Sequence, residues 1–339
     1  MTKNERIRAF ATLGEWMCNP DRDSLFRIES IHLQNAWYTK ENILKQFQAL
    51  GQNLTVEKLE QWTSAYPIQD GMNNKTVGLV LAGNIPLVGF HDLLSTLITG
   101  FTALVKLSSD DAGVSKLIIH KLLEIEPRFQ QHIHLVDRLS NFDLVIATGS
   151  NNTARYFEYY FGKKPNIIRK NRNSVAVLTG KESTKELHLL GYDIFDYFGL
   201  GCRSVSKIFL PSGYNIATFF EAIEPFKDIK DHFKYSNNYD YNKSIYLVNG
   251  DKHYDNGFLL LKEDERIASP LAVVYYEEYD SLSDVESFIN NHADQIQCVT
   301  SMTPLNIRTP QFALGGSQCP ALNDYADGVD TLKFLTDHQ

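Results

Sequence analysis

The spacing of hydrophobic residues changes near residue 76. Before this point, apolar residues recur at helical spacing, as in Ile43, Phe47 and Leu50, which indicates helices packed against a core. After it, short continuous apolar runs alternate with amphipathic stretches. The chain is therefore predicted to begin with a helical segment over residues 1–67 and to continue as an α/β fold.

Four apolar runs after this point have the length and continuity of strands that are covered on both faces. They span residues 77–83, 103–107, 132–136 and 142–148. Residues 86–99 and 111–124 have helical spacing, and Gly149-Ser150 is placed to open a further helix. Strands that alternate with helices in this way predict a doubly wound parallel sheet.

A second α/β region follows residue 173. Residues 174–178 and 205–211 have the composition of strands. Between them, Ser183 and Glu186 have the spacing of a capping box, which predicts a helix that begins there. The later segment 235–246 is rich in Tyr and Asn, and we expect it to form a loop or a hairpin insertion.

Composition and charge exclude several classes of protein. Of the 339 residues, 43% are hydrophobic, which excludes a disordered chain. The 33 Lys and Arg residues are outnumbered by 41 Asp and Glu, and this balance argues against a nucleic-acid surface. No apolar run approaches the roughly 20 residues of a membrane helix, and the N-terminus lacks the apolar core of a signal peptide. We therefore expect a soluble cytoplasmic protein with no membrane span, and a homo-oligomer is left open.

Polar residues or glycines follow three of the predicted strands. They are Asn84, Lys106, Ser108, Ser109, Gly149 and Ser150. In doubly wound sheets, ligands bind beyond the carboxyl ends of the strands, and a helix that begins at Ser150 would favour an anion such as a pyrophosphate. The usual Gly-x-Gly-x-x-Gly fingerprint of a dinucleotide site is missing. A purely structural turn is the alternative at each position.

One of the four cysteines lies in a glycine-flanked loop. The cysteines are Cys18, Cys202, Cys298 and Cys319, and their spacing fits no zinc site. Cys202 directly follows Gly199-Leu200-Gly201, where glycines permit the close approach of a substrate. Arg203 and Lys207 are placed to favour the thiolate form of Cys202, which is the nucleophilic form. The local residues leave a catalytic and a structural cysteine equally open.

The order of these motifs resembles the aldehyde dehydrogenase superfamily. That superfamily carries, in order, an Asn-Pro turn, a strand-end Lys, a Gly-Ser helix start and a Gly-Gln-x-Cys-x-x-x-x-Arg loop. The corresponding motifs here are Asn84-x-Pro86, Lys106, Gly149-Ser150 and Gly199-x-x-Cys202-x-x-x-x-Lys207. The stretch from 314–317 through 332–335 is similar to the closing segment of that superfamily. The resemblance covers residues 76–339.

Within the superfamily, the chain most resembles the acyl-CoA reductase branch typified by the fatty acyl-CoA reductase of bacterial bioluminescence. This closer likeness lies in residues 172–178, 202–204, 269–271 and 324–330. The resemblance implies an α/β, aldehyde dehydrogenase-like fold. We expect a helical N-terminus and a doubly wound dinucleotide-binding domain over residues 1–170. We expect an α/β catalytic domain with the closing segment over residues 171–339.

The resemblance also implies a reaction through a thioester on Cys202. The thiolate attacks an acyl-CoA, which this branch implies to be a fatty acyl-CoA, coenzyme A leaves, and a nicotinamide cofactor reduces the acyl group to an aldehyde. The Asn84 amide and the Cys202 N–H are the implied donors to the oxyanion. The implied cofactor-binding residues are Lys106, Ser108, Ser109, Gly149 and Ser150. Ser109 stands where some relatives carry a Glu that repels a 2′-phosphate, so NADPH is expected; Asp110 and Asp111 weaken this preference and keep NADH as an alternative.

Three departures from the superfamily affect this interpretation. Hydrolytic relatives carry a Glu that activates water, and counting back from Cys202 places Ile168 there. Its absence favours reduction over hydrolysis, unless Glu158 or Glu182 takes its place. Glu265 lies one residue too early for a Glu that contacts the nicotinamide ribose. Leu200 replaces the Gln of the cysteine loop.

Other functions stay open from the sequence. The chain could be an aldehyde dehydrogenase that oxidises aldehydes. It could also be a cysteine acyltransferase or thioesterase without hydride transfer, which would need no nicotinamide site. A non-catalytic binding protein would carry an unreactive, buried Cys202.

Overall fold

The computed structural model describes residues 1–339, which divide into two compact units. Unit 1 consists of Met1–Asn171 and Ala321–Gln339, and unit 2 consists of Arg172–Pro320. We expected the final segment to close the second domain, but it packs in unit 1. The physical reason is that Leu332 and Leu335, on helix α12 (Thr331–Thr336), are buried in the hydrophobic core of that unit.

Unit 1 begins with four helices, which confirms the helical N-terminus. They are α1 (Lys3–Cys18), α2 (Arg22–Ile31), α3 (Lys40–Gly51) and α4 (Val56–Ser64). Each follows a Thr or Asp whose side chain accepts a backbone N–H of the first turn, as expected of a good N-cap residue. The apolar faces of these helices pack into the core that also covers the sheet of the unit.

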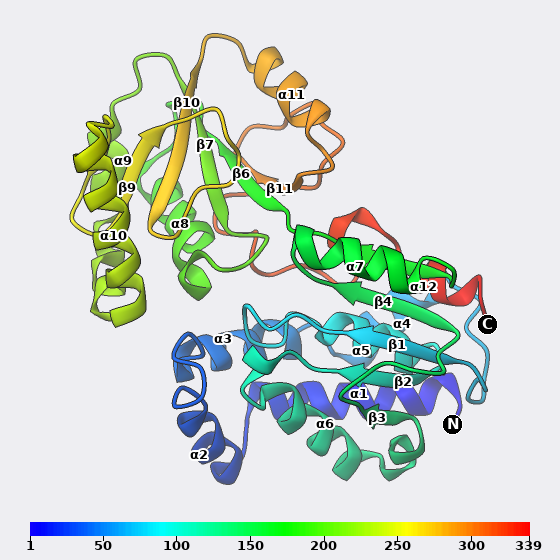
Figure 1. The fold of residues 1–339 in the computed structure, drawn as a ribbon. Coiled ribbons are helices and arrows are strands. Elements are labelled where there is room, and N and C mark those ends of the chain that lie inside the picture. The colour runs from blue at the N-terminus through cyan, green and yellow to red at the C-terminus, as the bar shows by residue number, and fades with distance from the viewer. The chain divides into compact units, whose positions relative to one another are not determined.

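The sheet of unit 1 contains five parallel strands in the order β3-β2-β1-β4-β5 (Figure 1). The strands are β1 (Thr76–Val80), β2 (Thr102–Lys106), β3 (Ile133–Leu135), β4 (Leu144–Thr148) and β5 (Asn166–Arg169). The helices that alternate with them are α5 (Phe90–Ile98), α6 (Val114–Ile125) and α7 (Asn151–Phe161). This is the doubly wound order, and it reverses direction between β1 and β4. The predicted fold class is confirmed.

Helix α5 begins later than its amphipathic pattern suggests. We expected a helix from residue 86, but Leu87 adopts a left-handed conformation with φ of 57°. An L-residue in that conformation cannot continue a right-handed helix. The chain between Val80 and Phe90 is therefore a loop at the carboxyl end of β1.

Unit 2 is built on a seven-stranded sheet in the order β12-β11-β6-β7-β10-β9-β8 (Figure 1). The strands are β6 (Asn173–Val177), β7 (Val205–Pro211), β8 (Tyr254–Asp255), β9 (Leu260–Glu263), β10 (Val273–Tyr279), β11 (Ile296–Thr300) and β12 (Gln311–Phe312). All pairs are parallel except β8 with β9 at one edge.

Helices cover both faces of this sheet, because each buried strand contributes apolar side chains to both. The helices are α8 (Thr184–Phe195), α9 (Ile216–Ile223), α10 (Phe233–Asn249) and α11 (Leu282–Asn291). On β6, Ala176 belongs to the apolar cluster of α8 and α9, whereas Val175 and Val177 belong to the cluster of α11. The predicted capping box at the start of α8 is present.

The Tyr-rich segment 235–246 is a helix, so the expectation of a loop or hairpin is wrong. Tyr235, Tyr239 and Tyr246 recur at helical spacing and are buried. Asn242 donates from its amide to the Asn238 carbonyl one turn earlier and to the Leu271 carbonyl. The composition suggested a loop because Asn and Tyr are weak helix formers, but packing of this tyrosine face outweighs that preference.

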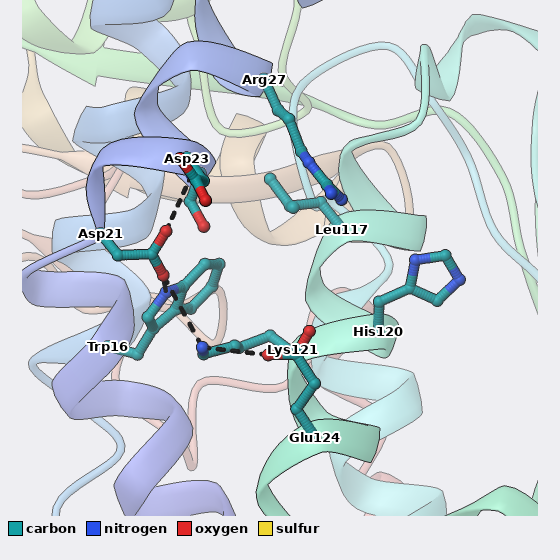
Figure 2. A pocket seen from close by; sticks show the side chains of 9 residues that line it. Trp16, Asp21, Asp23, Arg27, Leu117, His120, Lys121 and Glu124 are labelled. Carbon is teal, nitrogen blue, oxygen red and sulfur yellow. Dashed lines mark hydrogen bonds and ion pairs between the residues drawn. The ribbon is translucent and has the colours of Figure 1, made fainter.

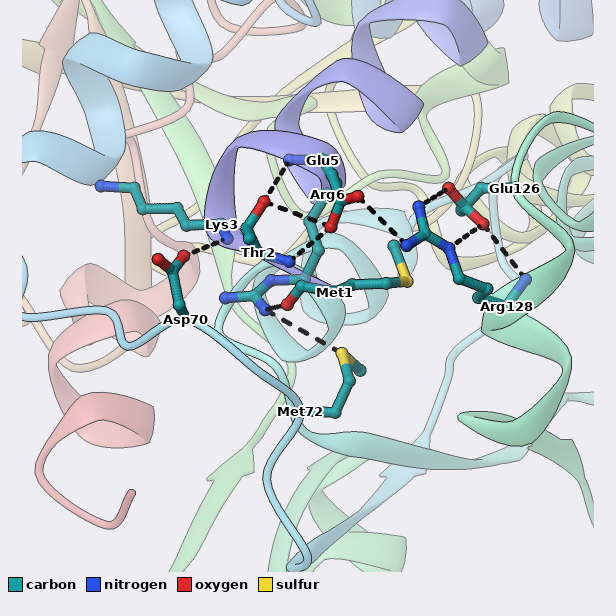
Figure 3. Close-up of polar contacts among 9 residues, drawn as sticks. All are labelled: Met1, Thr2, Lys3, Glu5, Arg6, Asp70, Met72, Glu126 and Arg128. Atoms are coloured by element: carbon teal, nitrogen blue, oxygen red, sulfur yellow. Dashed lines mark hydrogen bonds and ion pairs between the residues drawn. The ribbon is translucent and has the colours of Figure 1, made fainter.

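A buried arginine ties the first helix of unit 1 to two distant segments. The Arg6 side chain is fully buried, and burial lowers its pKa. Its guanidinium donates to the carbonyls of Gln69 at 2.8 Å, of Gly71, and of Ile98 at 3.0 Å. Figure 3 shows the same group beside Met1 and Met72. No carboxylate forms an ion pair with this guanidinium. Arg6 therefore acts by donating several hydrogen bonds to backbone carbonyls.

Replacing Arg6 by Met is expected to lower the free energy of unfolding by about 3 kcal/mol, because several buried carbonyls lose their donor. Denaturant unfolding followed by circular dichroism measures this loss. The matched control is Arg128→Met, since exposed Arg128 pairs with Glu5 and Glu126 (Figure 3) and surface pairs contribute little. Equal stability of the Arg6 variant and the native protein would contradict the assignment.

None of the helices is long and apolar enough to cross a membrane.

Candidate active site

The sheet of unit 1 brings three predicted ligand-binding turns to one edge. On the central strand β1, Val80 pairs with Lys106 of β2 on one side and with Ala147 of β4 on the other. The loops that carry Asn84, Ser108 and Gly149 therefore leave neighbouring parallel strands at their carboxyl ends. The order of strands reverses between β1 and β4, and this is where doubly wound sheets bind ligands.

The Asn84 turn lies tightly against the loop that follows β2. Asn84 itself is exposed, whereas Gly83 is buried. A Cβ atom on Gly83 would lie 2.8 Å from the Ser108 Cβ and 3.0 Å from the Asp111 backbone nitrogen. Only glycine permits this close approach of the two loops. The predicted Asn84 and Ser108 regions are thus packed together.

Lys106 and Ser109, two of the predicted cofactor-binding residues, both reach the surface of unit 1. No hydrogen bond or ion pair engages the half-buried Lys106 ammonium, and Ser109 is exposed. Ser108 uses its hydroxyl to accept the Asp110 N–H at 3.2 Å, which caps the 3-10 turn Ser109–Asp111.

Only one of the two acids near Ser109 faces solvent. Asp111 is buried, its carboxylate accepts both the N–H and the hydroxyl of Ser115, and burial raises its pKa. Asp110 is exposed. The acidic pair that weakened the expected preference for NADPH therefore reduces to one exposed carboxylate.

Gly149 and Ser150 form the start of α7, as predicted. The Ser150 hydroxyl accepts the Thr153 N–H at 3.2 Å and caps the helix. A Cβ atom on Gly149 would lie 2.9 Å from the ring of Phe157. The glycine is therefore required by helix packing, whether or not a ligand binds here.

In unit 2, an unusual backbone precedes Cys202. Tyr197, Phe198 and Gly199 have successive φ values of 53°, 59° and 77°. The left-handed conformation costs about 1–2 kcal/mol for each residue that is not glycine, and such strain concentrates at functional sites. Buried Tyr197 anchors the turn, and its carbonyl accepts the Leu200 N–H at 3.1 Å.

Cys202 is half-buried in a turn at the amino ends of β6 and β7. The Ser174 hydroxyl donates to the Cys202 carbonyl at 3.0 Å, and the Ser204 N–H donates to the Gly201 carbonyl at 3.0 Å. Ser174 also lies 3.1 Å from the sulfur of Cys298. Burial raises the pKa of the Cys298 thiol to about 11, so this second cysteine is a neutral packing residue.

The two residues after Cys202 are tied to a second turn. Arg203 donates to the Ser317 carbonyl at 3.4 Å, and the Gln318 amide donates to the Ser204 hydroxyl at 3.3 Å. Sequence reasoning gave no role to these partners, because they lie more than a hundred positions along the chain.

Asp193 of α8 fixes that second turn. Its buried carboxylate accepts the Gly315 N–H at 2.6 Å, and the Ser317 N–H and hydroxyl at 3.0 and 2.6 Å. Burial raises the pKa of Asp193 to about 6 even with these donors, which act in the opposite direction. No motif in the sequence marks Asp193 as part of the site.

The expected effect of Lys207 on Cys202 is wrong. Lys207 is fully buried in β7, and its ammonium pairs with Glu277 at 2.6 Å. It also donates to the carbonyls of Asp264 and Glu265. Because these partners use the ammonium, Lys207 stabilises the sheet and the loop before β10. Arg203 remains as the cation next to Cys202 in the sequence.

Within unit 2, Glu182 does not take the place of the water-activating Glu. Ile168 lies in β5, and the following Lys170 pairs with Glu158 at 2.9 Å. Glu182 accepts the N–H groups of Thr179 and Gly180 beyond the carboxyl end of β6. Cys202 lies at the opposite end of β6. This strand has five residues and is therefore about 16 Å long.

A small hollow adjoins the Cys202 loop in unit 2. It has a volume of about 70 Å³, and residues of α8, α10 and β10 are among those that line it. Its lining includes Gly201, Ser204, Ile194, Tyr235 and Leu271. Sequence reasoning did not find this hollow, because its lining comes from separate segments of unit 2.

A larger hollow in unit 1 contains none of the predicted site residues. It measures about 280 Å³ and lies between the start of α2 and the exposed side of α6 (Figure 2). Some of its charged groups are partnered: Asp21 accepts the Trp16 ring N–H at 2.8 Å, and Lys121 pairs with Glu124 at 3.1 Å. Because the hollow contains no residue of the predicted site, it carries no part of the proposed reaction.

The chain matches the sequence profile of the family described as acyl-CoA reductase (LuxC) over residues 22–222. No curated protein matches the chain in sequence. Among solved structures, the chain is similar to aldehyde dehydrogenase 21 from Physcomitrella patens in complex with the reaction product succinate. The two chains are 12% identical with a TM-score of 0.70, and the match covers 99% of this chain and 84% of the other.

Two bacterial structures give the same fold. An NAD-dependent benzaldehyde dehydrogenase from Corynebacterium glutamicum is 12% identical, with a TM-score of 0.70 and coverage of 92% of this chain and 81% of the other. An aldehyde dehydrogenase from Mycobacterium tuberculosis, complexed with NAD+, is 14% identical, with a TM-score of 0.64 and coverage of 93% and 78%. At these identities the likeness shows the fold, and it confirms the predicted aldehyde dehydrogenase-like architecture.

Proposed function

This chain belongs to the acyl-CoA reductase (LuxC) family, and from that premise we propose that it reduces a fatty acyl-CoA to the aldehyde with NADPH through a thioester on Cys202. The observation that carries the proposal is the Cys202 loop. The half-buried Cys202 follows a strained left-handed turn, and its backbone carbonyl accepts a hydrogen bond from the Ser174 hydroxyl. The other cysteine beside it, Cys298, is buried and has a raised pKa.

In the proposed first step, the Cys202 sulfur forms a bond to the thioester carbonyl carbon. The bond from this carbon to the sulfur of coenzyme A then breaks, and coenzyme A leaves as its thiol after taking up one proton. Negative charge develops on the carbonyl oxygen during the attack. We assign its stabilisation to the Cys202 N–H and the Asn84 amide, since such donors contribute roughly 3–4 kcal/mol each.

The residues of unit 1 fit a nicotinamide dinucleotide. Lys106 offers an unpaired ammonium, Ser109 an exposed hydroxyl, and the α7 N-terminus at Ser150 favours a phosphate. When bound, the cofactor supplies the hydride that reduces the acyl carbon. Addition of hydride would give the oxyanion of a thiohemiacetal on Cys202; its carbon–sulfur bond then breaks, which releases the aldehyde and restores the thiolate.

The test of this function is a cofactor-oxidation assay with an acyl-CoA series of increasing chain length. The proposal expects one aldehyde and one free coenzyme A for each NADPH oxidised. Release of coenzyme A with free carboxylic acid and no cofactor oxidation would support a thioesterase instead. Oxidation of aldehydes to free acids without coenzyme A would support an ordinary aldehyde dehydrogenase.

Ser109→Glu is expected to raise the Kd for NADPH roughly tenfold while leaving NADH nearly unaffected, because a carboxylate repels the 2′-phosphate. Fluorescence titration with both cofactors measures this difference. Ser109→Ala is the matched control and should keep the native preference. Equal weakening of both cofactors in the Glu variant would contradict a 2′-phosphate at this position.

A further inference from the structure

A buried tyrosine from the N-terminal helical segment reaches the Asn84 turn. Tyr38 lies between α2 and α3, and its side chain is fully buried. Its hydroxyl lies 2.9 Å from the Gly83 carbonyl oxygen and 3.0 Å from the Ile85 carbonyl oxygen, and it donates to both. Burial raises the pKa of Tyr38 far above its ordinary value, so the hydroxyl keeps its proton.

The two carbonyls that Tyr38 holds are those on either side of Asn84. Asn84 is exposed and lies in the loop between β1 and α5. This loop includes the left-handed Leu87, and it leaves the sheet where the order of strands reverses. The Gly83 carbonyl belongs to the peptide that precedes Asn84, and the Ile85 carbonyl belongs to the peptide between Ile85 and Pro86. The hydroxyl therefore holds the chain on both sides of Asn84, which restricts the rotation of its backbone and the direction in which its amide points.

The turn that carries Tyr38, residues 35–38, also holds the loop after β2, which belongs to the proposed cofactor site. The Asn35 amide donates to the Asp110 carbonyl at 2.8 Å. Asn35 and Tyr38 are themselves joined, since the Tyr38 N–H donates to the Asn35 carbonyl at 2.9 Å. One short turn, residues 35–38, therefore fixes the loops that follow β1 and β2. Gly83 and Ser108 pack against each other between these two attachments.

We infer that Tyr38 is a positioning residue that fixes the backbone of Asn84, the residue to which the proposed function assigns a hydrogen bond to the oxyanion. The inference rests on the proposed function for its catalytic consequence, whereas the restraint on the turn is a property of unit 1 alone. A donor that is displaced by about 1 Å can lose much of its effect on the transition state, with costs up to roughly a hundredfold in rate. The hydroxyl should therefore affect kcat more than substrate binding.

Tyr38→Phe tests this role because it removes the hydroxyl and keeps the buried ring. We expect hydrogen–deuterium exchange of the peptide spanning residues 83–89 to become at least about fivefold faster. We expect kcat for acyl-CoA reduction to fall roughly ten- to a hundredfold, with KM for acyl-CoA and NADPH changed less than about threefold. Circular dichroism checks that the variant is folded.

Tyr66→Phe is the matched control. Tyr66 also comes from the N-terminal segment, and its hydroxyl bonds Tyr325 and Asp330 near the C-terminus of the chain. The Tyr66→Phe variant should keep both the hydrogen–deuterium exchange of residues 83–89 and the kcat for acyl-CoA reduction near the native values. A parallel loss in both variants would show a general loss of stability and would overturn the inference.

Failure of the inference about Tyr38 can be distinguished from failure of the proposed function. Native exchange of residues 83–89 in Tyr38→Phe would overturn the restraint whatever the activity of the enzyme. Faster exchange with an unchanged kcat would overturn the positioning role in an active reductase. If the native protein does not reduce acyl-CoA, the proposed function fails and the catalytic role of Tyr38 fails with it, and the exchange experiment still decides whether the hydroxyl restrains the turn.

Discussion

Replacing Cys202 by Ala is expected to lower kcat/KM for acyl-CoA reduction roughly a thousandfold or more, because the variant cannot form the covalent intermediate. The Cys202 backbone is held by Ser174 through the peptide carbonyl and by the Gly201–Ser204 turn. Neither attachment uses the sulfur, so the loop should persist in the variant. NADPH oxidation with the best acyl-CoA substrate measures the loss.

Cys18→Ala and Cys319→Ala are the controls for this prediction. Cys18 is a half-buried residue of unit 1, and Cys319 is exposed in unit 2. Both variants should keep nearly native activity. Cys298 is unsuitable as a control, because its sulfur packs on the Ser174 hydroxyl that holds the Cys202 carbonyl. Full activity of the Cys202 variant would end the proposal of a thioester on this residue.

The second large effect concerns the lifetime of the acyl group on the enzyme. Without NADPH, the acyl-enzyme should hydrolyse about 100- to 10,000-fold more slowly than in a relative with a positioned general base, because such a base typically contributes that factor. One of the two acids that could act as this base is accounted for within unit 2, since Glu182 lies at the far end of β6 from Cys202 and accepts two backbone N–H groups there.

Quantifying free carboxylic acid after a single acyl-CoA addition measures this lifetime. In the absence of cofactor, coenzyme A should be released in an amount equal to the enzyme, and free acid should appear slowly. Repeated turnover to free acid without cofactor would mean that another group activates water. The Glu158→Gln and Glu182→Gln variants would then identify which of the two carboxylates does so.

The sequence predicts the positions of the proposed ligand-binding turns because local patterns determine them. Continuous apolar runs mark buried parallel strands, and such strands end at one edge of the sheet. The loops at Asn84, Lys106 and Gly149 follow adjacent strands for this reason. The Ser183 capping box is equally local and is present.

The supporting side chains were not predictable in the same way. Tyr38 reaches carbonyls 45 and 47 positions along the chain, and Asp193 reaches a turn 122 positions away. No spacing rule connects such residues. Lys207 shows the opposite error, since it is near Cys202 in the sequence, yet its ammonium is buried against Glu277. Proximity along the chain does not give the direction of a side chain.

Helix α10 shows how packing overrides local preference. Its Tyr and Asn residues suggested a loop, but its buried tyrosines form a helical face, and Asn238 and Asn242 donate to carbonyls one turn earlier. The helix backbone therefore accepts a hydrogen bond from each of these two asparagine side chains. The alternation of buried and exposed tyrosines at helical spacing was the signal in the sequence that could have predicted it.

The most direct test of the account is the mass of the protein after mixing with acyl-CoA in the absence of cofactor, followed by a chase with NADPH. The account predicts a gain equal to one acyl group, located on the peptide that contains Cys202. Addition of NADPH should remove this mass and yield one aldehyde for each acyl group lost. An acyl group on any other residue, or its release as free acid during the chase, would contradict the proposed route through Cys202.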